Sequence, residues 1–183
     1  MANEWGPLEG LAGEWEGEKG GLDHAFSHSK GKVIDTPYRE KCTMKPFGPV
    51  DNGVQVLYGL DYKSSMWRDE GNPFHTEVGY WLWDAATGEI MKGFVVPRGI
   101  TVLAGGITTA DASEFTMKAA LGDARYNIGE NMYLSKNASS LSFEVTITIG
   151  KDTWSYDEIT MLRMNELEEP LAHTDHDTLH RVG

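Results

Sequence analysis

The segment Asn72–Trp83 constrains the fold of this chain more than any other part of the sequence. Side chains alternate between the two faces of an extended strand. Here both faces carry aromatic bulk, with Tyr80 on one and Trp81 on the other. An ordinary half-buried strand shows a polar face to water, so this strand is expected to be covered on both sides or to wrap around an interior. His75 and Glu77 share one face, which indicates either a satisfied polar cluster or a polar corner of a cavity.

Short extended segments separated by turn residues fill most of the chain. Alternation and turn signals predict strands at residues 36–45, 54–67, 89–96, 100–106, 113–121, 131–136, 139–149 and 153–164, after a first strand that opens at Trp15. Only Pro7–Ala12 is expected to form a short helical turn. Antiparallel strands must protect their edges, and an up-and-down barrel does so. The expected fold is an all-β barrel of about ten antiparallel strands, a single domain over residues 1–183, with a ligand-sized cavity.

Local patterns give further expectations. Trp15 is predicted to be a core tryptophan at one end of the barrel. Asp51–Gly53 is a tight turn signal. His24 and His28 stand in a polar, turn-like stretch, which predicts a loop rather than a strand. Cys42 is expected to pack as a small apolar residue.

Composition excludes several classes of partner. The chain has 16 Lys and Arg against 28 Asp and Glu, a formal charge of -12, which repels nucleic acids and anionic lipid surfaces. Cys42 is the only cysteine, so no disulfide forms within the chain. The N-terminus lacks a signal-peptide pattern, and no apolar run is long enough to span a membrane. A cytoplasmic protein is expected, with a small-molecule ligand and with homodimer formation left open.

The central segment resembles a known family. Gly71–Tyr80, reading Gly-Asn-Pro-Phe-His-Thr-Glu-Val-Gly-Tyr, is similar to the Gly-x-Pro-Met-His-x-Glu-x-Gly-Tyr of nitrobindins, which hold b-type heme in a fatty-acid-binding-protein-like barrel. Gly13–Lys19 is similar to the family's Gly-x-Trp-x-Gly-x-Gly, with Lys19 in place of the last glycine. Strand spacing is compatible over nearly the whole chain. The resemblance implies a lipocalin-like barrel that binds heme b, and nitric oxide binding and isomerisation of peroxynitrite to nitrate as the activity.

The C-terminal segment carries the residues that the resemblance makes important. Nitrobindins end in Pro-Leu-x-x-His followed after four residues by Leu-x-x-Val or Leu, and that His is the proximal iron ligand. Counting from Pro170-Leu171 or back from Leu179 places the ligand at Thr174, so His173 is one residue early. A one-residue offset turns a side chain to the other face, so His173 is expected to reach iron only through a bulge. His176 shares the face of Thr174, about 7 Å along the strand.

Three interpretations of the terminal histidines stay open. They can form a solvated polar edge with Asp175 and Asp177. They can ligate heme iron, through His173 as the favoured metal ligand or through His176. A zinc site is the third interpretation, although His176 and His180 are about 13 Å apart in an extended strand and cannot share one ion.

The resemblance places Phe74 and His75 beside the distal side of the heme pocket. From the residues alone, His75 equally fits a buried histidine bonded to Thr76 or Glu77. No hydrolase elbow, zinc-protease motif or phosphate loop is present. Besides the heme-binding function, two others stay open: a non-catalytic carrier of a small apolar ligand that has lost heme ligation, and an interaction protein whose cavity is filled by its own tryptophans.

Overall fold

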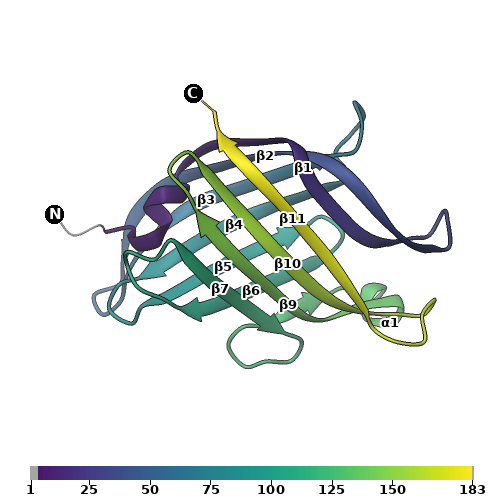
Figure 1. The fold of residues 1–183 in the computed structure, drawn as a ribbon. Helices are drawn as coiled ribbons and strands as arrows, with labels where there is room; N and C mark the ends of the chain where they lie inside the picture. The colour runs from purple at the N-terminus through teal and green to yellow at the C-terminus, as the bar shows by residue number, and fades with distance from the viewer. Residues whose placement is uncertain (1–3, 183) are drawn as a thin grey trace.

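A computed structural model describes residues 4–182, without the side chain of residue 19, and shows a closed antiparallel β-barrel (Figure 1). Residues 1–3, on which the prediction of no signal peptide partly rests, lie outside the described residues. The predicted all-β barrel is confirmed.

Two short helices and a series of strands make up the described chain. The helices are the 3-10 helix η1 (Gly6–Leu11) and α1 (Leu134–Asn137). The strands are β1 (Gly13–Ser27), β2 (Lys32–Asp51), β3 (Val56–Trp67), β4 (His75–Asp84), β5 (Glu89–Val96), β6 (Ile100–Ile107), β7 (Glu114–Ala120), β8 (Ile128–Glu130), β9 (Ala138–Ile149), β10 (Thr153–Met164) and β11 (Leu171–Arg181).

Ten of these strands close the barrel in the order β1-β2-β3-β4-β5-β6-β7-β9-β10-β11, and β11 pairs back with β1. The closure places the first and last strands side by side, purple beside yellow in Figure 1. The join between β6 and β7 is the shortest, with the single partner pair Gly105 and Lys118. The short strand β8 pairs with the start of β6.

Alternation along the strands sets which side chains face the interior. In β4 the inward positions Glu77, Trp81 and Trp83 are buried, as is the last residue Asp84, whereas Val78 and Tyr80 on the other face are 48% and 55% exposed. The segment therefore wraps around an interior and is not covered on both sides. Aromatic bulk on the outer face is tolerated because much of any protein surface is apolar.

Two local predictions were wrong. β1 extends to Ser27, so His24 lies in a strand, where it pairs with Asp35 of β2, whereas His28 lies in the turn after β1 as predicted. The polar residues around His24 belong to a long strand whose outer face meets water, and turn-like composition misled the prediction. Residues 131–136 are not a strand, since β8 ends at Glu130 and α1 follows; the side chain of Asn131 accepts a bond from the amide of Leu134 at the start of that turn.

The helix η1 closes one end of the barrel, while α1 lies at the opposite end (Figure 1). Leu8 and Leu11 of η1 are fully buried, and the backbone at Gly6 lies against the ring of Trp83. Trp15 is 1% exposed and its Nε1 donates to the carbonyl of Leu11 at 2.8 Å, so the predicted core role of Trp15 is confirmed. The barrel is thus filled by side chains at the η1 end.

Three further predictions are confirmed. The turn after β2 is closed by the Asn52 amide, which donates to the Gln55 carbonyl. Cys42 is buried in the core as a free thiol. The helical turn near the N-terminus is η1. Among the described residues, neither helix has the length and apolar character needed to cross a membrane.

Candidate functional site

A cavity of about 760 Å³ lies inside the barrel beyond the part packed by η1. Its volume falls in the range of about 300 to 1,000 Å³ that small-molecule sites occupy. Trp81 and Trp154 line it, with ring centroids 6.3 Å apart, whereas Trp15 and Trp83 lie outside its lining. The tryptophans therefore leave the cavity open, and the interpretation of a barrel filled by its own tryptophans is wrong.

The lining of this cavity combines aromatic walls with many ionisable groups. A second cavity of about 240 Å³ shares its histidines and two of its acidic groups and is otherwise lined mainly by apolar residues. The ionisable residues of the larger cavity are Asp23, His28, Arg68, His75, Glu77, Lys92, Arg98, Glu158, His173 and Asp175.

The last strand directs His173 into the cavity. In β11 the residues with odd numbers face inward, ending in the buried Asp177 and Leu179, whereas His176 is exposed. β11 pairs with β10 in continuous register from Leu171 to His180, so no bulge is present along this pairing. His173 thus faces the interior directly, and the expectation that it needs a bulge was wrong. Thr174 and His176 occupy the opposite face of the strand, outside both cavities.

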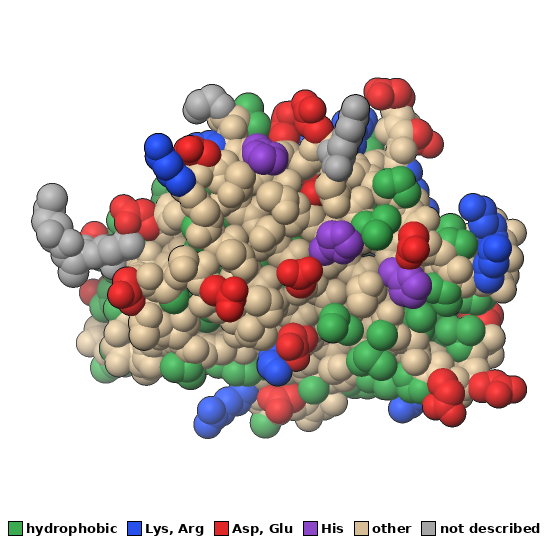
Figure 2. Space-filling view, viewed as in Figure 1, with side chains coloured by type: hydrophobic (Ala, Val, Ile, Leu, Met, Phe, Trp, Pro, Cys, Tyr) green, Lys and Arg blue, Asp and Glu red, His purple; other side chains and the backbone are tan. Residues whose placement is uncertain are grey.

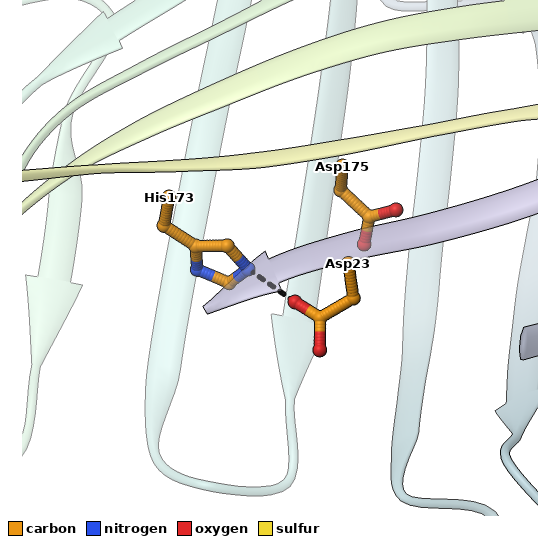
Figure 3. Close-up of side chains that lie close together, drawn as sticks. All are labelled: Asp23, His173 and Asp175. Atoms are coloured by element: carbon orange, nitrogen blue, oxygen red, sulfur yellow. Dashed lines mark hydrogen bonds and ion pairs between the residues drawn. The ribbon is translucent and has the colours of Figure 1, made fainter. Parts of the chain in front are cut away.

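Asp23, His173 and Asp175 form a cluster where β1 meets β11 (Figure 3). Nε2 of His173 lies 2.9 Å from Oδ1 of Asp23, and Nη2 of Arg68 lies 2.8 Å from Oδ2 of the same carboxylate. Burial raises the pKa of Asp23, but the hydrogen bonds and charges of His173 and Arg68 outweigh it, so the pKa lies below its usual range. Asp23 is therefore ionised at neutral pH.

Asp175 lies between two other carboxyl groups. It is the direct partner of Asp23 on β1 and of Glu158 on β10, and all three face the cavity. The Tyr38 hydroxyl donates to Oδ1 of Asp175. Burial, and then the charge of Glu158, raise the pKa of Asp175 to about 9. Burial also raises the pKa of Glu158 to about 7, although the charge of Lys92 opposes this shift.

Glu77 and Lys92 form a buried ion pair on the cavity wall. Nζ of Lys92 lies 2.9 Å from Oε2 of Glu77, and the two side chains are only 6% and 5% exposed. The Tyr62 hydroxyl donates to the same oxygen at 2.9 Å, and Nε2 of His75 lies 3.2 Å from Oε1. Burial raises the pKa of Glu77, but Lys92 and His75 outweigh it and hold the pKa below its usual range. The Phe94 ring centroid lies 4.3 Å from the ammonium group of Lys92.

Hydroxyl and carboxyl groups next to Asp175 form a hydrogen-bond network. The Tyr156 hydroxyl donates to Oε2 of Glu40 at 2.7 Å and lies 2.7 Å from the Tyr38 hydroxyl, and Ser64 donates to Oε1 of Glu40. Burial raises the pKa of Glu40 to about 7. This network connects Glu40 to Asp175 through Tyr156 and Tyr38. Its hydrogen bonds therefore fix the positions of Tyr156 and Asp175 on the cavity wall.

Phe74 and His75 lie at the wall of the cavity, on the side that β4 contributes. The guanidinium carbon of Arg68 stands 4.0 Å from the Phe74 ring centroid, and the Tyr38 ring contacts the same ring edge to face. His75 lines both cavities. The predicted residues Phe74, His75 and His173 thus line one cavity, and the predicted residue His176 does not.

The outer surface is chemically different from this interior. Figure 2 shows acidic side chains spread over the face formed by β1, β10 and β11, with few basic ones among them. This agrees with the formal charge of -12.

Sequence reasoning did not single out Asp23, Lys92 or Glu158 as site residues. Lys92 stands between Ile90 and Phe94 on the inward face of β5, so a charge at an apolar alternating position was the available signal. Glu158 shares a face with Trp154 and gave the same signal. No local pattern marks Asp23, because its role depends on the distant strand β11.

Comparisons with known proteins agree with this architecture. A family model described as "THAP4-like, heme-binding beta-barrel domain" matches residues 4–181. The crystal structure of Rv2717c from M. tuberculosis is similar, with a TM-score of 0.70 and 19% sequence identity, covering 100% of this chain and 99% of that chain. At this identity the likeness concerns the fold alone. No curated protein matches this sequence.

Proposed function

Because this chain belongs to the THAP4-like, heme-binding β-barrel domain family, the nitrobindin family that its sequence resembles, we propose that its cavity binds heme b through His173. The observation that carries the proposal is the inward direction of His173 on a strand in continuous register. Imidazole is an established axial donor to heme iron, as in globins and peroxidases.

The other residues of the cavity fit such a group. The wall offers apolar surface from Phe26, Phe74 and Val96 for a macrocycle, and Arg68 and Arg98 can face carboxylates. Nε2 of His173 already has a hydrogen-bond partner, because it lies 2.9 Å from Oδ1 of Asp23. Ligation through Nε2 therefore requires the imidazole to exchange its bond to Asp23 for the bond to iron.

His75 is the residue that we assign to the ligand side of the cavity. Burial lowers the pKa of His75, but the hydrogen bond and charge of Glu77 outweigh it, so the pKa lies above its usual range. A larger share of the imidazole is then protonated near neutral pH and can donate a hydrogen bond to an oxygen atom. Bound heme iron would supply a centre for nitric oxide and for the isomerisation of peroxynitrite to nitrate, in which no co-reactant is consumed.

The alternative of a carrier for a small apolar ligand is less well supported. A pocket for a fatty acid or another hydrocarbon gains affinity by burying apolar surface, whereas this wall places Asp23, Glu77, Lys92 and Glu158 along the cavity. These charged groups would lose hydration against a purely apolar ligand. A ligand with polar or metal centres suits the same wall better.

A hemin titration tests the proposed ligand. Wild-type protein should give a Soret band that is shifted in His173→Ala, because the axial donor sets the electronic state of the iron. The matched control is His176→Ala, which removes an exposed imidazole three residues along the same strand and should leave the band unchanged. An unchanged band in His173→Ala, or no uptake of hemin by the wild type, would overturn the proposal.

The proposed activity needs a separate measurement. In stopped-flow mixing with peroxynitrite, ferric protein should accelerate decay to nitrate, and His75→Ala should slow that decay by about a hundredfold at equal heme content. Nitrate yield measured by ion chromatography identifies the product. Decay equal to that of free hemin would leave heme binding standing and remove the isomerase activity.

A further inference from the structure

We propose that Asp23, His173 and Asp175 form a binding site for a divalent transition-metal ion. The ion would occupy this site when the protein carries no heme. One ligand atom from each residue lies within 4.8 Å of the other two. Figure 3 shows His173 and Asp175 projecting from β11 toward Asp23 on β1. Asp23 and Asp175 are direct partners in the pairing of β1 with β11, so the backbone fixes their relative position.

The spacing suits one ion. Ligands of a tetrahedral zinc ion lie about 2.0 to 2.2 Å from it, so they stand about 3.4 Å from one another. The three ligand atoms lie within 4.8 Å of one another, so side-chain rotations that bring the widest pair closer by up to roughly 1.4 Å would give this geometry. One imidazole and two carboxylates form a nitrogen and oxygen donor set that suits zinc, iron and manganese, and contains no soft sulfur ligand.

Charge balance points independently to a cation. Asp23, Asp175 and Glu158 follow one another directly across β1, β11 and β10, and like charges opposite one another on a sheet are destabilising. Among residues 4–182, Arg68 is the cation that contacts this row other than histidine, through Asp23. A divalent ion at this row would displace the protons that its carboxyl groups hold and would balance the carboxylates that form.

Within residues 4–182, the carboxylate of Glu158 lacks a partner next to the proposed site. Its side chain lines both cavities, yet within the described part of the chain no hydrogen bond or ion pair holds its carboxylate. A half-buried carboxylate that faces the cavity beside Asp175 without a partner is costly. A cation at the cluster would stand next to this carboxylate and supply the missing partner, either directly or through a bound water molecule.

Arg68 and Tyr38 hold the proposed ligands in place by hydrogen bonds, as the residues around a metal site do. Arg68 binds Oδ2 of Asp23 and leaves Oδ1 facing His173. The Tyr38 hydroxyl donates to Oδ1 of Asp175, and no group among residues 4–182 donates to the other carboxyl oxygen. Such outer contacts orient ligands, and their loss typically weakens metal binding by about 10- to 100-fold.

The inference does not rest on heme. Because His173 Nε2 can bind only one metal centre at a time, an ion at this cluster and heme iron would compete for the imidazole. Occupation of the cluster would therefore reduce uptake of hemin through His173. Asp175, by contrast, is needed for the ion and has no role in the proposed heme ligation.

Equilibrium dialysis of chelator-treated, heme-free protein against Zn²⁺, with metal analysis by mass spectrometry, tests the site. Wild-type protein should bind one equivalent, and Asp175→Asn and His173→Ala should each weaken binding at least about tenfold. The matched control His176→Ala should bind as the wild type does, since His176 lies on the outer face of the same strand. Circular dichroism verifies that each variant keeps the barrel.

Three results of the dialysis experiment would overturn the proposed metal site. Failure of the wild type to bind Zn²⁺, or wild-type binding in both Asp175→Asn and His173→Ala, would overturn the inference. Loss of binding only in His176→Ala would show a surface site and would overturn it too. Asp175→Asn should still take up hemin, so failure of the metal site and failure of the proposed heme function are distinguished by the same pair of variants.

Discussion

Replacing Lys92 by Met should lower the free energy of unfolding by about 3 kcal/mol. Met has a similar length and no charge, so it fills the space between the surrounding aromatic rings and removes the ion pair together with the contacts of the ammonium group with those rings. The pair is almost completely buried, with 6% and 5% of the two side chains exposed. After the substitution the carboxylate of Glu77 stays in the wall without its cation.

The magnitude follows from the contacts that remain. Removing one partner of a buried ion pair typically costs about 3 to 5 kcal/mol, because the other charge is left buried and unpaired. Glu77 keeps the Tyr62 hydroxyl at 2.9 Å and His75 at 3.2 Å. These two contacts place the expected cost at the lower end of the range. A charge-free pair in Lys92→Met/Glu77→Gln should recover part of the loss, since no unpaired charge remains.

Urea denaturation of heme-free protein at pH 7, followed by tryptophan fluorescence, measures the difference. The matched control is Lys118→Met, which breaks an ion pair with Glu144 of similar length, 2.8 Å, whose side chains are 66% and 47% exposed. That control should change stability by less than about 1 kcal/mol, because water screens an exposed pair.

Two results would refute this reasoning. If Lys92→Met and Lys118→Met cost the same, burial would not determine the strength of the pair. If the double variant were less stable than Lys92→Met alone, the unpaired carboxylate would not be the source of the cost. As a further check, the deficit of Lys92→Met should shrink as the pH falls, since protonation of Glu77 removes the unpaired charge.

Three other predictions concern stability. Trp15→Ala should cost about 3 to 5 kcal/mol in urea denaturation, and an unchanged midpoint would contradict its place in the core. The pKa values of Glu158 and Asp175 are raised to about 7 and about 9, so their protonated forms favour the folded state. In chelator, the stability that these groups contribute should be full below about pH 4 and should fall as the pH rises from there, until about pH 7 for Glu158 and about pH 9 for Asp175. Asp175→Asn should flatten that fall, and an equally steep curve in thermal melts across this range would contradict the assignment. Gly79→Ala should cost about 1 to 3 kcal/mol, because a Cβ there would lie 2.0 Å from the Gly93 carbonyl oxygen. In the control Gly93→Ala the Cβ would lie 3.5 Å from a side-chain carbon of Leu103 and 4.0 Å from the Tyr80 carbonyl oxygen, which are ordinary contacts, so it should cost less.

Much of the barrel could be predicted because strand alternation is a local signal. The predicted strands at residues 89–96 and 153–164 match β5 and β10, whose inward faces are marked by Ile90 and Trp154. The segment 131–136 was predicted wrongly, because a single helical turn is too short to show a helical period.

The candidate site could be predicted only in part. His75 and Phe74 were identified from a local motif, and both line the cavity. The direction of His173 was predicted wrongly, because the face that a strand turns inward is set by its pairing with β1 and β10 and not by counting from Pro170. Lys92 and Glu158 carry charge at positions where alternation predicts apolar residues, and only their partners across the barrel explain them.

The pairing of β1 with β11 has a consequence for how the protein folds. Asp23 and His173 are separated by 150 residues along the chain, and the strands that carry them meet only when the barrel closes. Contacts between residues so far apart in sequence are costly to form early, so this pairing is expected to be among the late events of folding. During synthesis, a ribosome-bound chain has no such site until β11 has been released. Ligand occupancy of the cavity would therefore report that folding is complete, and a ligand added to refolding protein should bind only in the slowest phase.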